Sequence, residues 1–134
     1  MQQTKGKFEM SDRELLEMAA KAAGYQLKIM CDPVDSGEEG SDFFHLDNRY
    51  WNPLTEDGDA FRLMIDLNLD LTFDIIEGEV FVCETFGDYW SEYLEDNPRA
   101  ASRRAIVRAA ADIGRAMLKI DDKEINENNE NNDE

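Results

Sequence analysis

Side chains with the chemistry for catalysis are either scarce in this chain or too numerous to be informative. His45 is the only histidine, and no serine stands in the Gly-x-Ser-x-Gly pattern that presents a nucleophile in hydrolases. The chain has 31 acidic residues, so many carboxylate pairs suited to acid–base catalysis are available and none stands out. Glycine-rich phosphate loops are absent. We therefore predict that the chain is not an enzyme and that it has no catalytic residues and no cofactor.

A cation site is suggested only superficially, by the acidic run Glu56-Asp57-Gly58-Asp59. The run lacks the alternating oxygen ligands and the bidentate glutamate at the twelfth position of an EF-hand loop. Its carboxylates are interpreted instead as caps at the start of a helix, where the helix dipole favours negative charge. Cys31 and Cys83 lie in separate apolar segments and, with His45, provide too few ligands for a tetrahedral zinc site. We predict reduced cysteines that serve packing, and no metal site.

Positive charge is concentrated in one segment, between Arg99 and Lys119, which holds six basic residues and a single acid. At the helical repeat of about 100° per residue, four of these bases fall on one face, within about 60° of one another and opposite an apolar stripe. This basic ridge consists of Arg104, Arg108, Arg115 and Lys119. Three interpretations are open: ion pairs with neighbouring acids that keep the helix soluble, contact with a protein partner, and contact with nucleic acid. The acidity of the rest of the chain makes direct binding of nucleic acid the least favoured.

Negative charge dominates elsewhere, since the 31 acids are set against 14 bases and leave a formal net charge of −17. Several carboxylates lie on or beside a predicted hairpin, where they form an array suited to the positive groove of a nucleic-acid-binding protein. The array consists of Asp70, Asp74, Glu77, Glu79 and Glu84. The alternative is that the acidity serves only solubility.

An aromatic side chain just before a predicted helix, in the sequence Trp51-Asn52-Pro53-Leu54, also has two interpretations. An exposed Trp51 ring would anchor a partner protein. A buried ring would instead fill the edge of the core, while the proline directs the chain into the helix.

The pattern around these residues predicts alternating helices and strands. A capping box at residues 11–14 begins a helix that ends at Gly24, and Glu77-Gly78 makes a tight turn between two half-apolar strands. Asn97-Pro98 begins an alanine-rich helix. The predicted elements are a helix over 11–23, strands over 25–31 and 43–47, a helix beginning within 55–59, strands over 69–75 and 79–85, and a helix over 98–120, with segment 87–96 as a short helix or an ordered loop.

This order, α-β-β-α-β-β-α, predicts an α+β fold: a three-layer α/β/α sandwich with a mainly antiparallel four-stranded sheet and helices on both faces. The expected organisation is a flexible leader over 1–10, a single domain over 11–120 with a mobile acidic loop over 32–42, and a disordered acidic Asn/Glu tail over 121–134. Residues 1–120 still carry a net charge of about −11. The chain has neither a membrane-spanning apolar run nor a signal peptide, so a cytoplasmic location is expected.

Three segments resemble the phage alpha-beta-alpha sandwich domain, a family of small bacteriophage and prophage proteins. They are residues 15–25, the sequence Trp51-Asn52-Pro53-Leu54 with residues 57–60 and Leu63, and residues 97–105. The resemblance covers roughly residues 12–118 and implies a phage origin, a three-layer fold and a location in the bacterial host cytoplasm. The family has no settled activity, so no catalytic residue follows from it. The loop over 32–42, segment 87–96 and the tail lie outside the family pattern.

These observations predict a non-enzymatic, phage-encoded accessory protein that binds a host protein. Inhibition of a host defence factor and acidic mimicry of DNA are the two forms of this role that fit the charge. The alternative is a structural or assembly protein, also without catalytic activity, that forms a homo-oligomer through exposed aromatic side chains: Trp51, Trp90 and Tyr93. Neither prediction involves a membrane.

Overall fold

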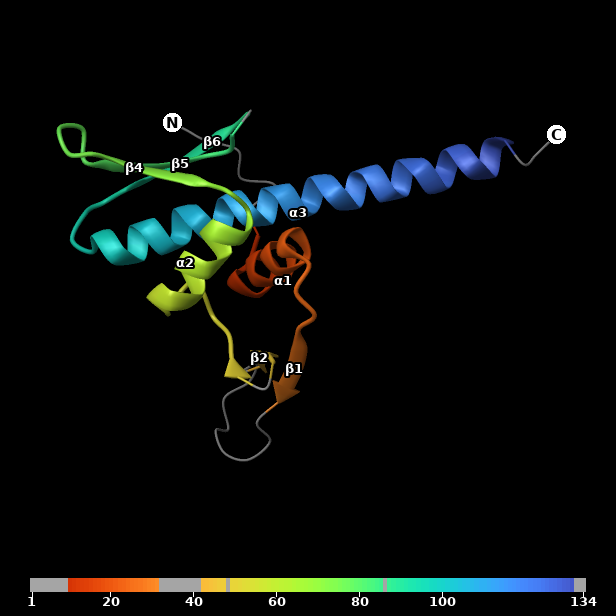
Figure 1. Cartoon of the computed structure of the whole chain (residues 1–134), viewed down its shortest axis with the longest axis horizontal. Helices are drawn as coiled ribbons and strands as arrows, with labels where there is room; N and C mark the ends of the chain where they lie inside the picture. The colour runs from red at the N-terminus through yellow and green to blue at the C-terminus, as the bar shows by residue number, and fades with distance from the viewer. Residues whose placement is uncertain (1–9, 32–41, 48, 86, 132–134) are drawn as a thin grey trace.

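The computed structural model of the chain (Figure 1) describes residues 10–31, 42–47, 49–85 and 87–131, with side chains described up to Leu118 except over 29–31 and at 42 and 43. The elements are α1 (Asp12–Ala23), β1 (Lys28–Cys31), β2 (Asp42–Leu46), β3 (Arg49–Tyr50), α2 (Asp57–Asp66), β4 (Asp70–Asp74), β5 (Glu79–Cys83), β6 (Tyr89–Tyr93) and α3 (Pro98–Asn131). The predicted α+β class is confirmed, while β3 and β6 are absent from the sequence-based prediction.

The strands form two separate antiparallel sheets. β1, β2 and β3 make the first sheet, and β4, β5 and β6 make the second. The prediction of a single four-stranded sheet is therefore wrong. An alternating pattern identifies a strand, and a short turn identifies its neighbour, but neither says which hairpins share a sheet. Here α2 lies between the two sets of strands along the chain, and each set pairs only with itself.

A helix, not a sheet, occupies the centre of the fold (Figure 1). α3 packs against α1 and α2 on one side and against β5 and β6 on the other, so the predicted sandwich with a central sheet is also wrong. The buried positions of α3 cover about two thirds of its circumference, much more than the single narrow stripe expected of a surface helix. These positions are Ala105, Ile106, Val107, Ala109, Ala110 and Ala111. The four alanines allow neighbouring elements to approach α3 closely from several directions.

The predicted signals at both ends of α1 are confirmed. The Ser11 hydroxyl accepts a hydrogen bond from the Glu14 amide at 3.2 Å, and the Ser11 amide donates to the Glu14 carboxylate at 3.0 Å. Gly24 ends the helix in the left-handed conformation, with φ at 77°. Further along, α1 crosses α3 with almost no space between them, because a Cβ added at Gly114 would lie 2.0 Å from the Met18 carbonyl oxygen.

The predicted hairpin is confirmed, and it gains a third strand. Gly78 has φ at 71°, and the Glu77 amide donates to the Asp74 carboxylate at 3.0 Å, which closes the β4–β5 turn. β6 pairs with β5 and places Trp90 opposite Val82. The prediction of a short helix or an ordered loop for segment 87–96 is therefore wrong over β6.

The chain ends bear on the predicted domain boundaries. α3 continues through Asn131, into the segment for which composition predicts disorder, and the disordered tail stays a prediction. The predicted leader lies outside the described residues except for Met10, which packs against the core. The predicted mobile loop also lies outside them, at 32–41. Within the described part of the chain, no helix is long and apolar enough to cross a membrane.

Candidate functional site

The sheet of β4, β5 and β6 has one face turned toward α3, called here the inner face. Val80, Val82 and Trp90 point to this side and are buried. The Trp90 indole N–H donates to the Asp112 carboxylate of α3 at 2.6 Å, which satisfies the polar atom of a side chain that is only 8% exposed. Around these three side chains the inner face is therefore a packed interface within the molecule.

The opposite side of the same sheet is called here the outer face. Successive strand residues point to opposite sides, so the register defines its nine members. They are Asp70, Thr72, Asp74, Glu79, Phe81, Cys83, Tyr89, Ser91 and Tyr93. Among the described elements, α3 is the helix that packs against this sheet, and it does so from the inner side. The outer face thus presents three acids, three aromatic rings and no base.

Acidic side chains lie at both ends of the outer face. Tyr93 is in register with the acids at one end and Tyr89 with Asp70 at the other, while Phe81 lies between the two ends. At one end Asp74 is paired with Glu79 in the strand register, and Glu77 is exposed in the adjoining turn. At the other end Asp70 is paired with Cys83, which immediately precedes Glu84. The two ends are four residues apart along β4, or about 13 Å. The structure thus places three acids of the predicted array, Asp70, Asp74 and Glu79, on the outer face, whereas Glu77 lies in the adjoining turn and Glu84 follows the end of β5.

Aromatic rings on β5 and β6 give the outer face its apolar character. Tyr89 and Tyr93 are 65% and 68% exposed, and the Tyr89 ring lies 5.9 Å from the ring of Phe81. Cys83 is a free, half-buried thiol next to Tyr89 in the register. Exposed aromatic rings of this kind are characteristic of interaction sites, because they bury a large area at low entropic cost.

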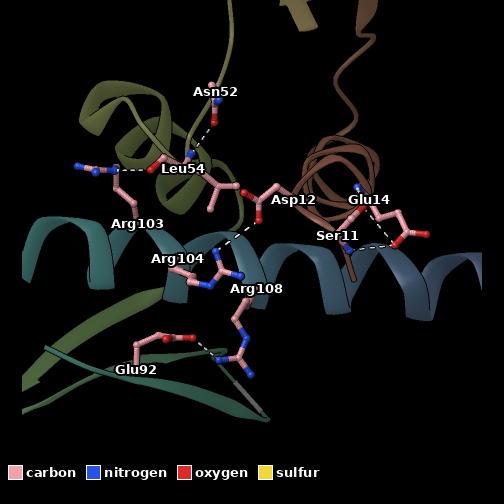
Figure 2. Close-up of polar contacts among 9 residues, drawn as sticks. All are labelled: Ser11, Asp12, Glu14, Asn52, Leu54, Glu92, Arg103, Arg104 and Arg108. Carbon is pink, nitrogen blue, oxygen red and sulfur yellow. Dashed lines mark hydrogen bonds and ion pairs between the residues drawn. The ribbon is translucent and has the colours of Figure 1, made fainter. Parts of the chain in front are cut away.

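The basic ridge is largely occupied by contacts within the molecule (Figure 2). Arg104 pairs with Asp12 of α1 at 3.5 Å, and Arg108 pairs with Glu92 of β6. Arg115 is half-buried, and the side chain of Lys119 lies outside the described ones. For Arg104 and Arg108 the ion-pair interpretation is confirmed. Arg104 therefore links α3 to α1, and Arg108 links it to β6.

Trp51 is buried, at 2% exposure, and its ring lies edge-on to Tyr25 with the centroids 5.8 Å apart. The core-filling interpretation is therefore confirmed, and an anchoring role for an exposed Trp51 ring is excluded. Trp90 is buried as well, so Tyr93 is the one exposed ring of the three proposed for self-association.

The acidic run before α2 is held by arginines and by a backbone amide. Asp59 is 3% exposed, accepts a hydrogen bond from the Asn52 amide at 2.9 Å and pairs with Arg62 at 2.7 Å. Asp57 pairs with Arg103 at 2.6 Å. Asp57 and Asp59 lie in the first turn of α2, as predicted, but the N-cap residue Glu56 makes no capping hydrogen bond with its side chain, so that part of the prediction is wrong. In the part of the chain that the structure describes, no group of three or more His, Cys, Asp or Glu could hold a metal ion.

Two further titratable side chains lie apart from the outer face. Burial raises the pKa of the Tyr25 hydroxyl, and the hydrogen bond that it donates to Asp66, with the negative charge of that carboxylate, raises the pKa further. Tyr25 therefore stays protonated and acts as a donor. His45 is half-buried beside the Tyr50 ring, at a centroid distance of 6.3 Å.

Sequence reasoning missed an apolar groove between α2, β4 and the start of α3. It has a volume of about 440 Å³, and Phe61 and Phe73, which line it, are 57% and 46% exposed. Arg99 and Arg103 also line it. A signal was present, because Phe61 lies outside the buried stripe of α2, where a polar residue is expected.

Comparisons of the chain with family models, with curated proteins and with solved structures find no match. The resemblance to the phage family therefore stays a prediction, and the function is argued from the surfaces of the molecule itself.

Proposed function

We propose that this chain is a non-enzymatic, phage-encoded accessory protein that binds a basic, nucleic-acid-binding protein of its host. The outer face is the binding surface, and it competes with nucleic acid for the partner. One observation carries the proposal: acids and exposed aromatic rings share a sheet face against which no described helix packs. Inhibition of a host defence factor is one form of this activity.

The spacing of the charges supports mimicry of nucleic acid. The acidic ends of the outer face are about 13 Å apart, and the major groove between the two phosphate backbones of DNA is about 12 Å wide. A protein surface built to contact both backbones would meet negative charge at a comparable separation. Phe81 would then add apolar contact area between the charges, and Tyr89 and Tyr93 would add it beside them.

The overall charge favours encounter with a basic partner. With a formal charge of −17, the chain attracts positive surfaces over distances of about a Debye length and repels free nucleic acid. Arg104 and Arg108, which would oppose this attraction, are already paired with acids. Host interaction through the outer face therefore fits the charge better than direct binding of nucleic acid does.

The test is displacement of host proteins from immobilised DNA. A bacterial lysate is loaded onto DNA-cellulose, the chain is applied at low salt, and released proteins are identified and rebound in purified form. The face variant carries Asp70→Asn, Asp74→Asn and Glu79→Gln. The control variant carries Glu56→Gln, Glu95→Gln and Asp96→Asn, three exposed acids outside the outer face, so both variants have the same net charge.

We expect the wild type and the control variant to release the same host protein and the face variant to release little of it. The released protein should also bind the chain directly, with an affinity that falls as salt rises. Equal release by both variants would show that net charge alone acts, and would refute the assignment to the outer face. Absence of any released protein would refute competition with DNA.

A further inference from the structure

We propose that the apolar groove between α2, β4 and α3 receives the β4–β5 turn of a second copy of this chain, with the exchange made reciprocally in a two-fold dimer. This surface adjoins the outer face only at the turn end of the hairpin, and the inference does not depend on the proposed function. Three observations support it: the turn is exposed and apolar, the groove is apolar as well, and the turn directly follows the strand that lines the groove.

The β4–β5 turn carries two isoleucines that are largely exposed in the described structure. Ile75 is 77% exposed and Ile76 is 92% exposed, more than any other large apolar side chain described. The turn lies at the far end of the hairpin, away from α1 (Figure 1). Exposure of this much aliphatic surface is unfavourable in a free monomer and is typical of a contact surface.

The groove offers a floor for such side chains. Ala60, Phe61, Met64, Leu71, Phe73 and Ile106 contribute to its lining, and nearly all of its exposed surface is apolar. Its volume of about 440 Å³ accommodates a small cluster of aliphatic groups. Because the groove is open on one side, it suits a protruding turn better than an enclosed small molecule.

Charge complements the apolar match. Asp74 and Glu77 flank the two isoleucines of the turn. Arg99 lines the groove with its side chain 82% exposed, and it lies 4.0 Å from Asp57, which leaves its guanidinium open to a second carboxylate. A turn seated in the groove would bring its acids to this arginine, which sets the direction in which the turn enters.

The position of the two features favours a closed dimer. Phe73, on β4, lines the groove and lies only two residues before Ile75 of the turn. Turn and groove therefore belong to one continuous surface. When a surface carries both a projection and its matching recess, a two-fold axis engages both pairs at once and leaves neither free to extend a filament.

The net charge of the chain sets the salt dependence. Two copies at −17 each repel one another, and salt screens that repulsion while leaving the apolar contact intact. We expect more dimer at about 1 M NaCl than at about 0.1 M, where the Debye length is about 10 Å. A contact held only by Arg99 and carboxylates would respond in the opposite direction.

Sedimentation velocity of the full chain, from about 1 μM to about 1 mM at both salt concentrations, tests the proposal. Ile76→Asp removes the projection, and Phe61→Asp blocks the groove; each should weaken dimerisation by at least about tenfold. Tyr93→Asp is the matched control, because it also replaces an exposed large side chain with one negative charge, on the outer face. It should leave the dimer unchanged. All three sites are exposed, and far-UV circular dichroism checks that each variant is folded.

Mixing the two dimer-deficient variants gives the decisive result. The Ile76→Asp chain keeps an intact groove and the Phe61→Asp chain keeps an intact turn, so one of the two contacts survives in the mixed pair. We expect heterodimer in the mixture and monomer in each variant alone at the same concentration. A monomeric wild type at every concentration and salt would overturn the proposal, and so would a dimer that survives Ile76→Asp or a mixture that stays monomeric.

Discussion

Replacement of Gly114 by alanine should destabilise the protein, although the same change usually stabilises a helix. Alanine in a helix interior is favoured over glycine by about 1 kcal/mol. At this position, however, the new Cβ would lie 2.0 Å from the Met18 carbonyl oxygen, whereas ordinary contact begins at 3.4 Å. The atom in the way belongs to the backbone of α1, so no rotation of a side chain can relieve the overlap. The two helices must move apart by about 1.4 Å.

The magnitude follows from what that movement loosens. Leu15, Leu16 and Ala19 of α1 are buried in the core to which α3 also contributes, and a gap of about 1 Å forfeits up to about half of each dispersion contact. Overpacking of a core typically costs about 1–3 kcal/mol and sometimes more, and a backbone clash belongs at the upper end of that range. After subtraction of the gain in helix propensity, we expect a net loss of about 2 kcal/mol or more.

Urea denaturation measures this loss, followed both by circular dichroism and by the fluorescence of Trp51 and Trp90. A loss of about 2 kcal/mol corresponds to a fall of about 6 °C in Tm for a chain of this size. Gly58→Ala is the control: its Cβ would lie 3.3 Å from the end of the Arg62 side chain and meets no backbone atom, so that variant should change the free energy of unfolding by less than about 1 kcal/mol. A Gly114→Ala protein as stable as the wild type would refute the close crossing of α1 and α3.

Two further changes test contacts elsewhere in the fold. Asp112→Ala leaves the Trp90 indole N–H without its acceptor and should cost about 1–2 kcal/mol in urea denaturation, whereas Asp112→Asn, which keeps an acceptor, should cost less than half as much. Tyr25→Phe tests the raised pKa of Tyr25. The folded state holds this proton more tightly than the unfolded state, so the contribution is complete below the unfolded pKa of about 10 and declines as pH rises above it. The difference in unfolding free energy between wild type and Tyr25→Phe should shrink above about pH 10; a difference that stays constant to about pH 11.5 would contradict the shift.

The features that could be predicted from the sequence are those set by neighbouring residues. Ser11 and Glu14 are three positions apart, so the capping box depends only on local geometry, and Gly24 and Gly78 adopt the positive φ values that glycine permits. Pro98 marks the start of α3, and this signal is local too, because the fixed φ of proline suits the first turn of a helix.

The features that could not be predicted depend on contacts between distant segments. Trp90, Tyr93 and Leu94 recur at three- and four-residue intervals, which favours a helical turn, yet pairing with β5 makes this segment a strand. The pattern of α3 predicts one buried stripe, but burial on several sides arises because helices and a sheet both pack against it. The pattern of apolar and polar residues gives the spacing of the apolar positions, but it does not say how many other elements will pack against them.

The two candidate surfaces differ in how easily they are recognised from the sequence. The acids of the outer face are recognisable because charge stays exposed wherever the fold places it. The groove and the turn are harder to recognise, because Phe73 and Ile76 look like core residues in the sequence and are exposed in the folded chain. Phe61, which lies outside the buried stripe of α2, is the one of these residues that gives a signal. Apolar residues that the fold leaves uncovered are therefore the more informative sign of an interface, since charge alone already has an explanation in solubility.

Salt separates the two proposed interfaces in a single titration. Binding of a basic partner at the outer face depends on attraction between unlike charges and weakens as salt screens it. Dimerisation through the groove depends on apolar contact between two copies of the same strongly acidic chain and strengthens as salt screens their repulsion. The turn that carries Ile76 also carries Glu77 of the acidic array, so the two interfaces adjoin at one end of the hairpin. A dimer that forms at high salt and a partner complex that forms at low salt would therefore be alternative states of one protein, with the β4–β5 hairpin common to both.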